Sequence, residues 1–165
     1  MDYNAVLLEA IDRLVKAYEA GNLRLYTEAD LQSYLFHYCL KVLDEHQAVR
    51  PYPIHCNYSL LSPREKVDLT LGERDVAVVI RLEPDYPELS PSRKPAIFSE
   101  DILHDEERMR RHNEEGIAHC YLIVLDEDGC HLRALPKSPW KRLDNSGRDA
   151  YLLVKHCRAG DGTSL

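Results

Sequence analysis

The sequence has none of the long apolar runs that a membrane protein needs. No run approaches the roughly 20 apolar residues of a membrane-spanning helix. The first residues, MDYNAVLLEAIDRLVK, carry acidic side chains where a signal peptide has a basic end and an unbroken apolar stretch. We therefore expect no membrane partner and an intracellular, cytoplasmic location.

A net positive charge is also missing. The formal net charge of −7 argues against a protein that coats nucleic acid nonspecifically, because neutralising phosphates needs an exposed basic surface. Local phosphate contact stays open, since Arg108, Arg110 and Arg111 lie close together and residues 93–94 and 141–142 are basic pairs. Such a cluster is more often a solvated helix face than a binding site.

The cysteines do not form the pairs that a disulfide framework or a zinc finger requires. There are five, without a C-x-x-C pair, and the odd number favours reduced thiols. Four adjoin a histidine, in the dipeptides His55-Cys56, His119-Cys120, Cys130-His131 and His156-Cys157. Neighbours on a strand point to opposite faces, so each dipeptide could offer only one ligand to a zinc ion. The pattern favours buried cysteines, with the histidines on the wetter face.

The composition is that of one globular domain. With 165 residues, 44% hydrophobic and 30% charged, the chain is long enough for one substantial core and too short for two ordinary domains. We predict a single domain over residues 1–159. The polar, Gly-containing end at 160–165 is expected to fray.

The hydrophobic periodicity predicts alternating helices and strands. Helices are expected over residues 3–20, 27–46 and 99–116. Strands are expected over residues 54–61, 67–71, 76–83, 118–125, 130–135 and 151–157. The order strand, helix, strand over residues 76–125 predicts a right-handed crossover between parallel strands. The expected fold class is α/β, with a central mixed β-sheet flanked by helices.

Two segments stand outside this pattern. Residues 84–95 contain four prolines and form the long irregular connection of the chain, where function is often located. Trp140 lies in a polar, proline-preceded segment. We expect its ring to cover a sheet edge or to lie in an interface.

The centre of the sequence is a predicted hairpin over residues 66–83. Apolar and polar residues alternate in 67–71, as on a strand with one buried face. If the two strands pair with their apolar faces stacked, Asp68 lies on the same side as Arg81 and Glu83. A carboxylate beside a cation on a half-buried sheet is either a structural ion pair or the floor of a site.

Residues 25–135 resemble the PD-(D/E)XK nuclease superfamily, which has the restriction-endonuclease-like fold. TEADLQSYL resembles the first helix of that family, whose glutamate would be Glu28, and Val67-Asp68-Leu69 resembles its metal-binding Asp motif. The resemblance implies that Asp68 and an acidic residue on the next strand hold Mg²⁺. A lysine two positions further on would position or activate the water.

The E-x-K part of this motif is degenerate, because it reads Val79-Ile80-Arg81. Valine cannot bind a metal, and arginine keeps its charge but does not release a proton near neutral pH. Two arrangements could restore a site. Either Glu83, one step along the same face, supplies the missing carboxylate, or Glu28 and Asp68 alone hold the metal with water.

A purely structural interpretation of the same residues is also open. Asp68 and Arg81 would form a cross-strand ion pair, while Glu28 would cap its helix or accept a bond from Arg81. The acidic run Asp105, Glu106 and Glu107 on the crossover helix could project toward the site, but a solvated face is the expectation for it.

The resemblance therefore leads to two main functional expectations. The first is a Mg²⁺-dependent DNA phosphodiesterase in which Asp68, Glu28 and Glu83 hold the metal and Arg81 stabilises the charge of the transition state. The second is a catalytically inactive module that binds a protein partner or forms a homodimer through the proline-rich loop, Trp140 and a strand edge. DNA binding without cleavage is a third, weaker expectation.

Overall fold

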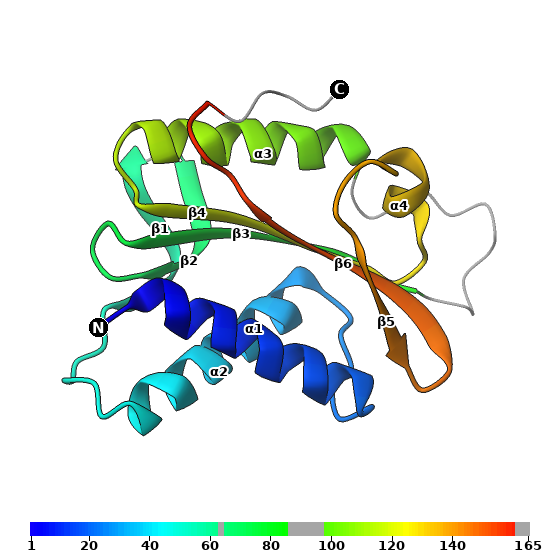
Figure 1. Ribbon diagram of the computed structural model, residues 1–165, viewed down its shortest axis with the longest axis horizontal. Helices are drawn as coiled ribbons and strands as arrows, with labels where there is room; N and C mark the ends of the chain where they lie inside the picture. Colours follow the sequence, from blue (N-terminus) through cyan, green and yellow to red (C-terminus); the bar gives the residue numbers. More distant parts are fainter. Residues whose placement is uncertain (63–64, 86–97, 161–165) are drawn as a thin grey trace.

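The computed structural model describes residues 1–62, 65–85 and 98–160, which form a sheet with helices on both faces (Figure 1). The helices are α1 (Tyr3–Glu19), α2 (Glu28–Glu45), α3 (Ser99–Glu114) and α4 (Cys130–Ala134). The strands are β1 (Ile54–Ser62), β2 (Glu65–Leu71), β3 (Val76–Glu83), β4 (His119–Asp126), β5 (Lys141–Asn145) and β6 (Arg148–His156).

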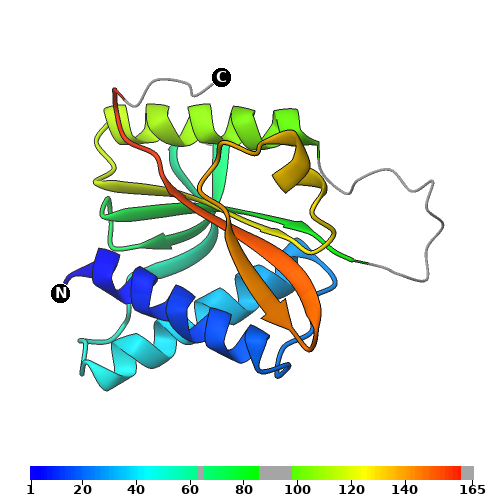
Figure 2. The same cartoon turned by 45° about the vertical axis from the view of Figure 1, so that its right-hand side comes forward.

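The sheet is mixed and has six strands in the order β1-β2-β3-β4-β6-β5. β3 and β4 run parallel and are joined through α3, while the other neighbouring pairs are antiparallel. Helices α1 and α2 cover one face, and α3 and α4 the other (Figures 1 and 2). The predicted α/β class, the mixed sheet and the parallel crossover are confirmed.

Each face of the sheet has its own apolar core. The larger core lies under α1 and α2 and includes Leu69, Leu71, Val78, Ile80 and Ile123. The smaller core lies under α3 and includes Val67, Ala77, Val79, Leu122 and Met109. Strand β3 contributes alternate residues to both, because successive side chains on a strand point to opposite faces.

Helix α2 begins where its sequence predicts. Thr27 Oγ1 accepts a hydrogen bond from the Asp30 N–H, and the Asp30 carboxylate accepts one from the Thr27 N–H. This reciprocal capping fixes the helix start. Glu28 is therefore held in the first turn, at the end of α2 that is close to β3.

The predicted strand over residues 130–135 is wrong, since residues 130–134 form α4. Gly129 has φ +71°, a conformation that glycine adopts without strain. The buried Asp126 carboxylate accepts hydrogen bonds from the N–H groups of Gly129, His131 and Leu132. These bonds coil the chain, so that it does not pair as a strand.

Three further differences concern strand ends and faces. β5 was not predicted, because Leu143 is its only buried residue and its apolar and polar residues alternate weakly. β6 begins at Arg148, before the predicted residue 151. Val67 was expected beside Leu69 and Leu71 but packs in the core under α3. The ladder between β2 and β3 ends at Leu69, so Val67 lies beyond the part of β2 that is paired with β3.

Some predictions fall on segments that are not described. Residues 86–97 of the proline-rich connection and residues 161–165 of the tail lie outside the described residues. In the described part of the chain, none of the helices combines the length and apolarity required to cross a bilayer.

Candidate functional site

The candidate site lies where β2 and β3 separate. The ladder between them pairs Leu71 with Val76 and ends at Leu69 with Val78. Beyond that point the Asp68 carboxylate accepts a hydrogen bond from the Ile80 N–H at 2.7 Å. A side chain thus replaces the missing backbone partner of β3, and the separation opens room for polar groups between the strands.

Arg81 joins the two layers of helices through this opening. Its Nε donates to Asp105 Oδ2 on α3 at 2.7 Å, and its Nη1 donates to Glu28 Oε2 on α2 at 3.3 Å. The side chain is 24% exposed, so the ion pairs are only partly screened by water. The predicted cross-strand ion pair between Asp68 and Arg81 is wrong: Arg81 pairs with Glu28 and Asp105, and Asp68 accepts from the Ile80 N–H instead. The predicted contact between Glu28 and Arg81 is confirmed. The structure adds Asp105 as its buried partner.

Asp105 is itself shared between two arginines. Its side chain is 5% exposed, and its Oδ1 accepts from Arg108 Nη2 at 2.8 Å. Arg108 Nη1 also donates to the Lys66 carbonyl at 3.3 Å. Asp105 and Arg108 are one helical turn apart on α3, so both reach the sheet from the same side of the helix.

The expectation that residues 105–107 face solvent is wrong for two of the three. Asp105 and Glu106 are buried, and only Glu107 is half exposed at 51%. Ile102 and Met109, at positions i−3 and i+4 relative to Asp105, are fully buried under the sheet. This spacing puts Asp105 on the same helix face, and it was the sequence signal that could have located the residue.

We call Glu28, Asp68, Asp105, Arg81 and Arg108 the acidic cluster. Its three carboxylates outnumber its two guanidinium groups, so one negative charge is in excess. Burial raises the pKa of both Asp68 and Glu28, and the neighbouring charge of Asp68 raises the pKa of Glu28 further, while Arg81 opposes both shifts. Burial opposes the charge on Arg81, but Asp105, Glu28 and Asp68 outweigh it and raise the pKa of Arg81.

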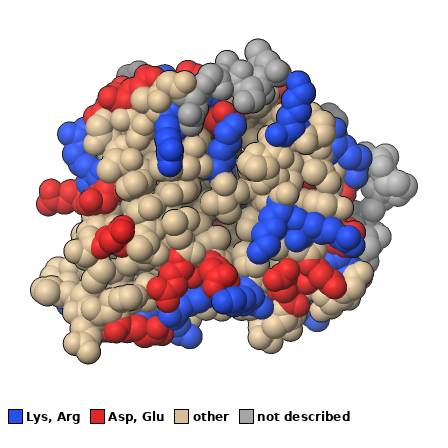
Figure 3. Space-filling view, viewed as in Figure 1, with Lys and Arg blue, Asp and Glu red and all other residues tan. Residues whose placement is uncertain are grey.

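Several basic residues outside this cluster form ion pairs within the chain. Arg110 pairs with Glu106 and Glu107, and Arg142 pairs with Asp149. Basic and acidic side chains are interspersed on the face shown in Figure 3. Arg110 and Arg142, which belong to the predicted basic groups, are thus already paired within the chain, and residues 93–94 lie outside the described part.

Glu83 has a different set of neighbours from the other predicted site residues. It lies on the same strand as Arg81, but it is 2% exposed and its Oε2 is 3.7 Å from His131 Nε2 on α4. The Cys130 thiol is close to both. The structure thus brings Glu28, Asp68 and Arg81 together and places Glu83 against α4.

The expected arrangement of cysteine and histidine holds for two of the four dipeptides. Cys120 and Cys157 are buried, and their neighbours His119 and His156 are partly exposed. Cys56 is exposed, contrary to the prediction. In the remaining dipeptide the order is reversed, because Cys130 is partly exposed and His131 is buried; both lie on a helix rather than on the predicted strand.

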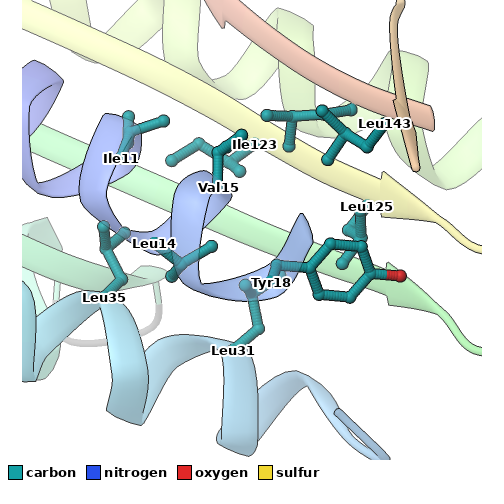
Figure 4. Close-up of a pocket in the computed structure, with 10 residues that line it drawn as sticks. Ile11, Leu14, Val15, Tyr18, Leu31, Leu35, Ile123, Leu125 and Leu143 are labelled. Carbon is teal, nitrogen blue, oxygen red and sulfur yellow. The ribbon is translucent and has the colours of Figure 1, made fainter. Parts of the chain in front are cut away.

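An apolar cavity between α1, α2 and the sheet is a poor candidate for a site (Figure 4). Its volume is about 20 Å³ and apolar side chains line it, among them Leu14, Leu35 and Ile123. The Tyr18 hydroxyl at its border donates to Glu127 at 2.6 Å. A space of this size holds about one water molecule, and an apolar lining gives water no partner. The cavity is a packing gap in the larger core.

The donor chemistry of the acidic cluster is suited to a hard divalent cation. Glu28, Asp68 and Asp105 offer carboxylate oxygens, the ligands that Mg²⁺ prefers, and the excess negative charge favours a bound cation. Their oxygens do not all lie within 4.8 Å of one another, so a shared ion would require the side chains to move closer together. Arg81 already contacts two of the three carboxylates, so it would compete with a metal.

Comparison of the chain with protein-family models, with curated proteins and with solved structures found no match.

Proposed function

We propose that the protein is a Mg²⁺-dependent phosphodiesterase of the restriction-endonuclease-like fold that acts on DNA at the acidic cluster. The observation that carries this proposal is the meeting of Glu28, Asp68 and Asp105, from α2, β2 and α3, around Arg81. Four elements distant in sequence supply these groups, and the fold holds them together with an excess of negative charge.

The order of elements supports the same proposal. A helix with an acidic first turn (α2), three antiparallel strands (β1, β2 and β3), a crossover helix (α3) and a strand parallel to β3 (β4) follow one another. This is the order on which the resemblance to PD-(D/E)XK nucleases rests. In that resemblance Asp68 would correspond to the metal-binding aspartate and Arg81 to the lysine of the motif.

In this proposal the carboxylates of the cluster bind the metal and its arginines bind the phosphate. Asp68, Glu28 and Asp105 would hold Mg²⁺, with Asp105 providing the carboxylate that Val79 cannot. The ion, when bound, polarises the phosphodiester and favours ionisation of water. Arg81 and Arg108 would bind the phosphate and stabilise its developing charge. Since arginine stays protonated, any proton must go to a carboxylate or to solvent.

Plasmid cleavage tests this proposal. The pure protein is incubated with supercoiled DNA and Mg²⁺ or Mn²⁺, and Mg²⁺ binding is measured by calorimetry. Asp68→Asn should abolish cleavage and metal binding, because it removes a charged ligand while leaving an oxygen for the Ile80 N–H. Asp149→Asn, on the exposed edge hairpin, is the matched control and should cleave like the unaltered protein.

A second candidate is the inactive module, favoured by the ion pairs that already satisfy Arg81. In that case the cluster joins α2, β3 and α3, and the exposed edge strand β1, with Tyr58 on its surface, is available to a protein partner or a second copy. Absence of both cleavage and Mg²⁺ binding would support this candidate. A concentration-dependent dimer that is lost in Tyr58→Asp would locate its interface on β1.

A further inference from the structure

A second group of side chains with metal-binding chemistry lies at the far end of β3. Glu83 and Asp126 are paired at the ends of β3 and β4, and the chain then turns through Gly129 into α4. This turn brings Cys130 and His131 back over the end of β3. One ligand atom from each of Glu83, Cys130 and His131 lies within 4.8 Å of the other two.

The His131 ring is oriented toward this group, and only one of its two nitrogen atoms has a hydrogen-bond partner among the described residues. The residue is 1% exposed. Its Nδ1 lies 3.0 Å from Ser99 Oγ at the start of α3, which fixes the ring. Its Nε2 has no hydrogen-bond partner among the described residues, although it is buried. A buried polar atom without a partner is costly in a folded protein and calls for an explanation.

The distance between His131 Nε2 and Glu83 Oε2 fits two ligands of one metal ion better than it fits a hydrogen bond. His131 Nε2 and Glu83 Oε2 are 3.7 Å apart, whereas a hydrogen bond would bring them to about 2.7–3.2 Å. Two ligands at about 2.1 Å from a tetrahedral zinc ion are roughly 3.4 Å apart. The observed separation is therefore close to the edge of a tetrahedral site, and a small adjustment of either side chain would complete it.

We propose that Glu83, Cys130 and His131 bind a divalent cation of the zinc class. A carboxylate oxygen, a thiolate and an imidazole form a mixed set that suits Zn²⁺ or Co²⁺ and not Mg²⁺. Three protein ligands leave one position of a tetrahedron for water. Because Cys130 is partly exposed, the ion can enter from solvent on that side.

The surrounding residues support the three ligands as an outer shell does in metal sites. Ser99 holds the His131 ring, and Asp126 holds the N–H groups of the turn from which Cys130 and His131 project. A metal binds the thiolate form of cysteine, so binding would release the Cys130 thiol proton to solvent.

Such an ion would fasten α4 to the end of β3, independently of the acidic cluster. A ligand that binds only the folded state raises its stability. Zn²⁺ should thus raise the melting temperature of the protein even where Mg²⁺ has no effect. The inference holds whether or not the protein cleaves DNA.

Cobalt substitution tests the site. The metal-free, reduced protein is titrated with Co²⁺, and the visible spectrum is recorded for the unaltered protein and for Cys130→Ser. We expect the intense bands of tetrahedral Co²⁺ with a thiolate charge-transfer band, displaced by one equivalent of Zn²⁺. Cys130→Ser should lose the charge-transfer band, and Glu83→Gln should weaken binding more than about tenfold.

Cys56→Ser is the matched control, because Cys56 also adjoins a histidine but is exposed on β1. Its spectrum should equal that of the unaltered protein. A second readout works without substitution at the site: Zn²⁺ should protect Cys130 from alkylation, measured by peptide mass, and should leave Cys56 reactive. An unchanged spectrum in Cys130→Ser, its loss in Cys56→Ser, or equal alkylation of Cys130 with and without Zn²⁺ would overturn the proposal.

Discussion

Arg81 and Glu83 lie two residues apart on the same strand, yet they belong to two clusters with different chemistry. The acidic cluster consists of carboxylates that already enclose two arginines. The other cluster combines oxygen, sulfur and nitrogen donors around a buried imidazole atom that lacks a hydrogen bond. The difference arises from the elements above the strand, since α2 and α3 contribute to the first cluster and α4 to the second.

This comparison shows how an internal cation changes a group of acidic residues. Arg81 lowers the repulsion among Glu28, Asp68 and Asp105 and ties three elements together, but it also occupies the place where a metal would bind. The first cluster is therefore expected to be stable without an added ion. The second is expected to gain stability when one is supplied.

The largest effect on the free energy of unfolding is expected from Asp126→Ala. Asp126 is fully buried, and its carboxylate satisfies three backbone N–H groups of the turn into α4. Losing it should lower the free energy of unfolding by about 3 kcal/mol, because these donors stay buried without a partner. Urea denaturation measures the loss. Co²⁺ binding should fall as well, whereas the response to Mg²⁺ should not change.

The control is Asp144→Ala, which removes a single exposed bond to the Gly147 N–H and should cost much less. If the two variants lost the same free energy of unfolding, the three hydrogen bonds of Asp126 would not stabilise the turn into α4 more than an exposed bond does.

Arg81→Met should have the next largest effect and lower the free energy of unfolding by about 2 kcal/mol. The change leaves Glu28 and Asp105 without their shared cation, and removing one partner of a buried pair costs about 3–5 kcal/mol; partial exposure of Arg81 reduces this. Arg142→Met, at an exposed pair, should have little effect.

The same variant sharpens the contrast between the clusters. Calorimetry should show tighter Mg²⁺ binding in Arg81→Met, because a competing charge has gone, and Co²⁺ spectra should be unchanged. Weaker Mg²⁺ binding would mean that Arg81 orders the ligands rather than competing with the ion.

Ser99→Ala should lower the free energy of unfolding by about 1 kcal/mol, the value of one hydrogen bond. It should also weaken Co²⁺ binding by about tenfold, because the His131 ring loses the contact that orients it. Ser99→Thr retains the hydroxyl and should restore both properties. Failure of the threonine variant to restore binding would assign the effect to the start of α3 instead.

The smallest effect on stability is expected from Asp68→Asn, and it depends on pH. Burial raises the pKa of Asp68 above its unfolded value of about 3.9, so the ionised carboxylate lowers stability at pH values above the folded pKa. The variant should be slightly more stable at pH 7, and this advantage should shrink as the pH falls toward about 4. Urea midpoints at several pH values measure it; a loss of stability at pH 7 would show that the Asp68 charge is stabilising.

Much of the fold could be predicted because it depends on local patterns. The capping residues at Thr27 and Asp30 and the period of the apolar residues mark α2, and the alternation over residues 76–83 marks β3. The predicted hairpin put Asp68 and Arg81 on the same side, and only a family resemblance added Glu28 to them. Periodicity does not fix where a helix start lies relative to a strand.

The residues that were missed depend on contacts between distant segments. Asp105 was assigned to solvent because an acidic run usually faces water, although its spacing from Ile102 and Met109 put it on the buried face. Residues 130–135 were assigned to a strand because a loop followed an apolar strand. The bonds from Asp126 decided otherwise.

By itself, the sequence determined the α/β class, the limits of the main helices and the parallel crossover. Helices and strands follow from local periodicity, and the order strand, helix, strand favours a parallel crossover. Tertiary structure alone decided which charged residues meet. Whether Arg81 pairs with Asp105, and whether Glu83 faces His131, depends on how α3 and α4 lie over the end of β3. That placement results from packing across the whole sheet and leaves no local pattern in the sequence.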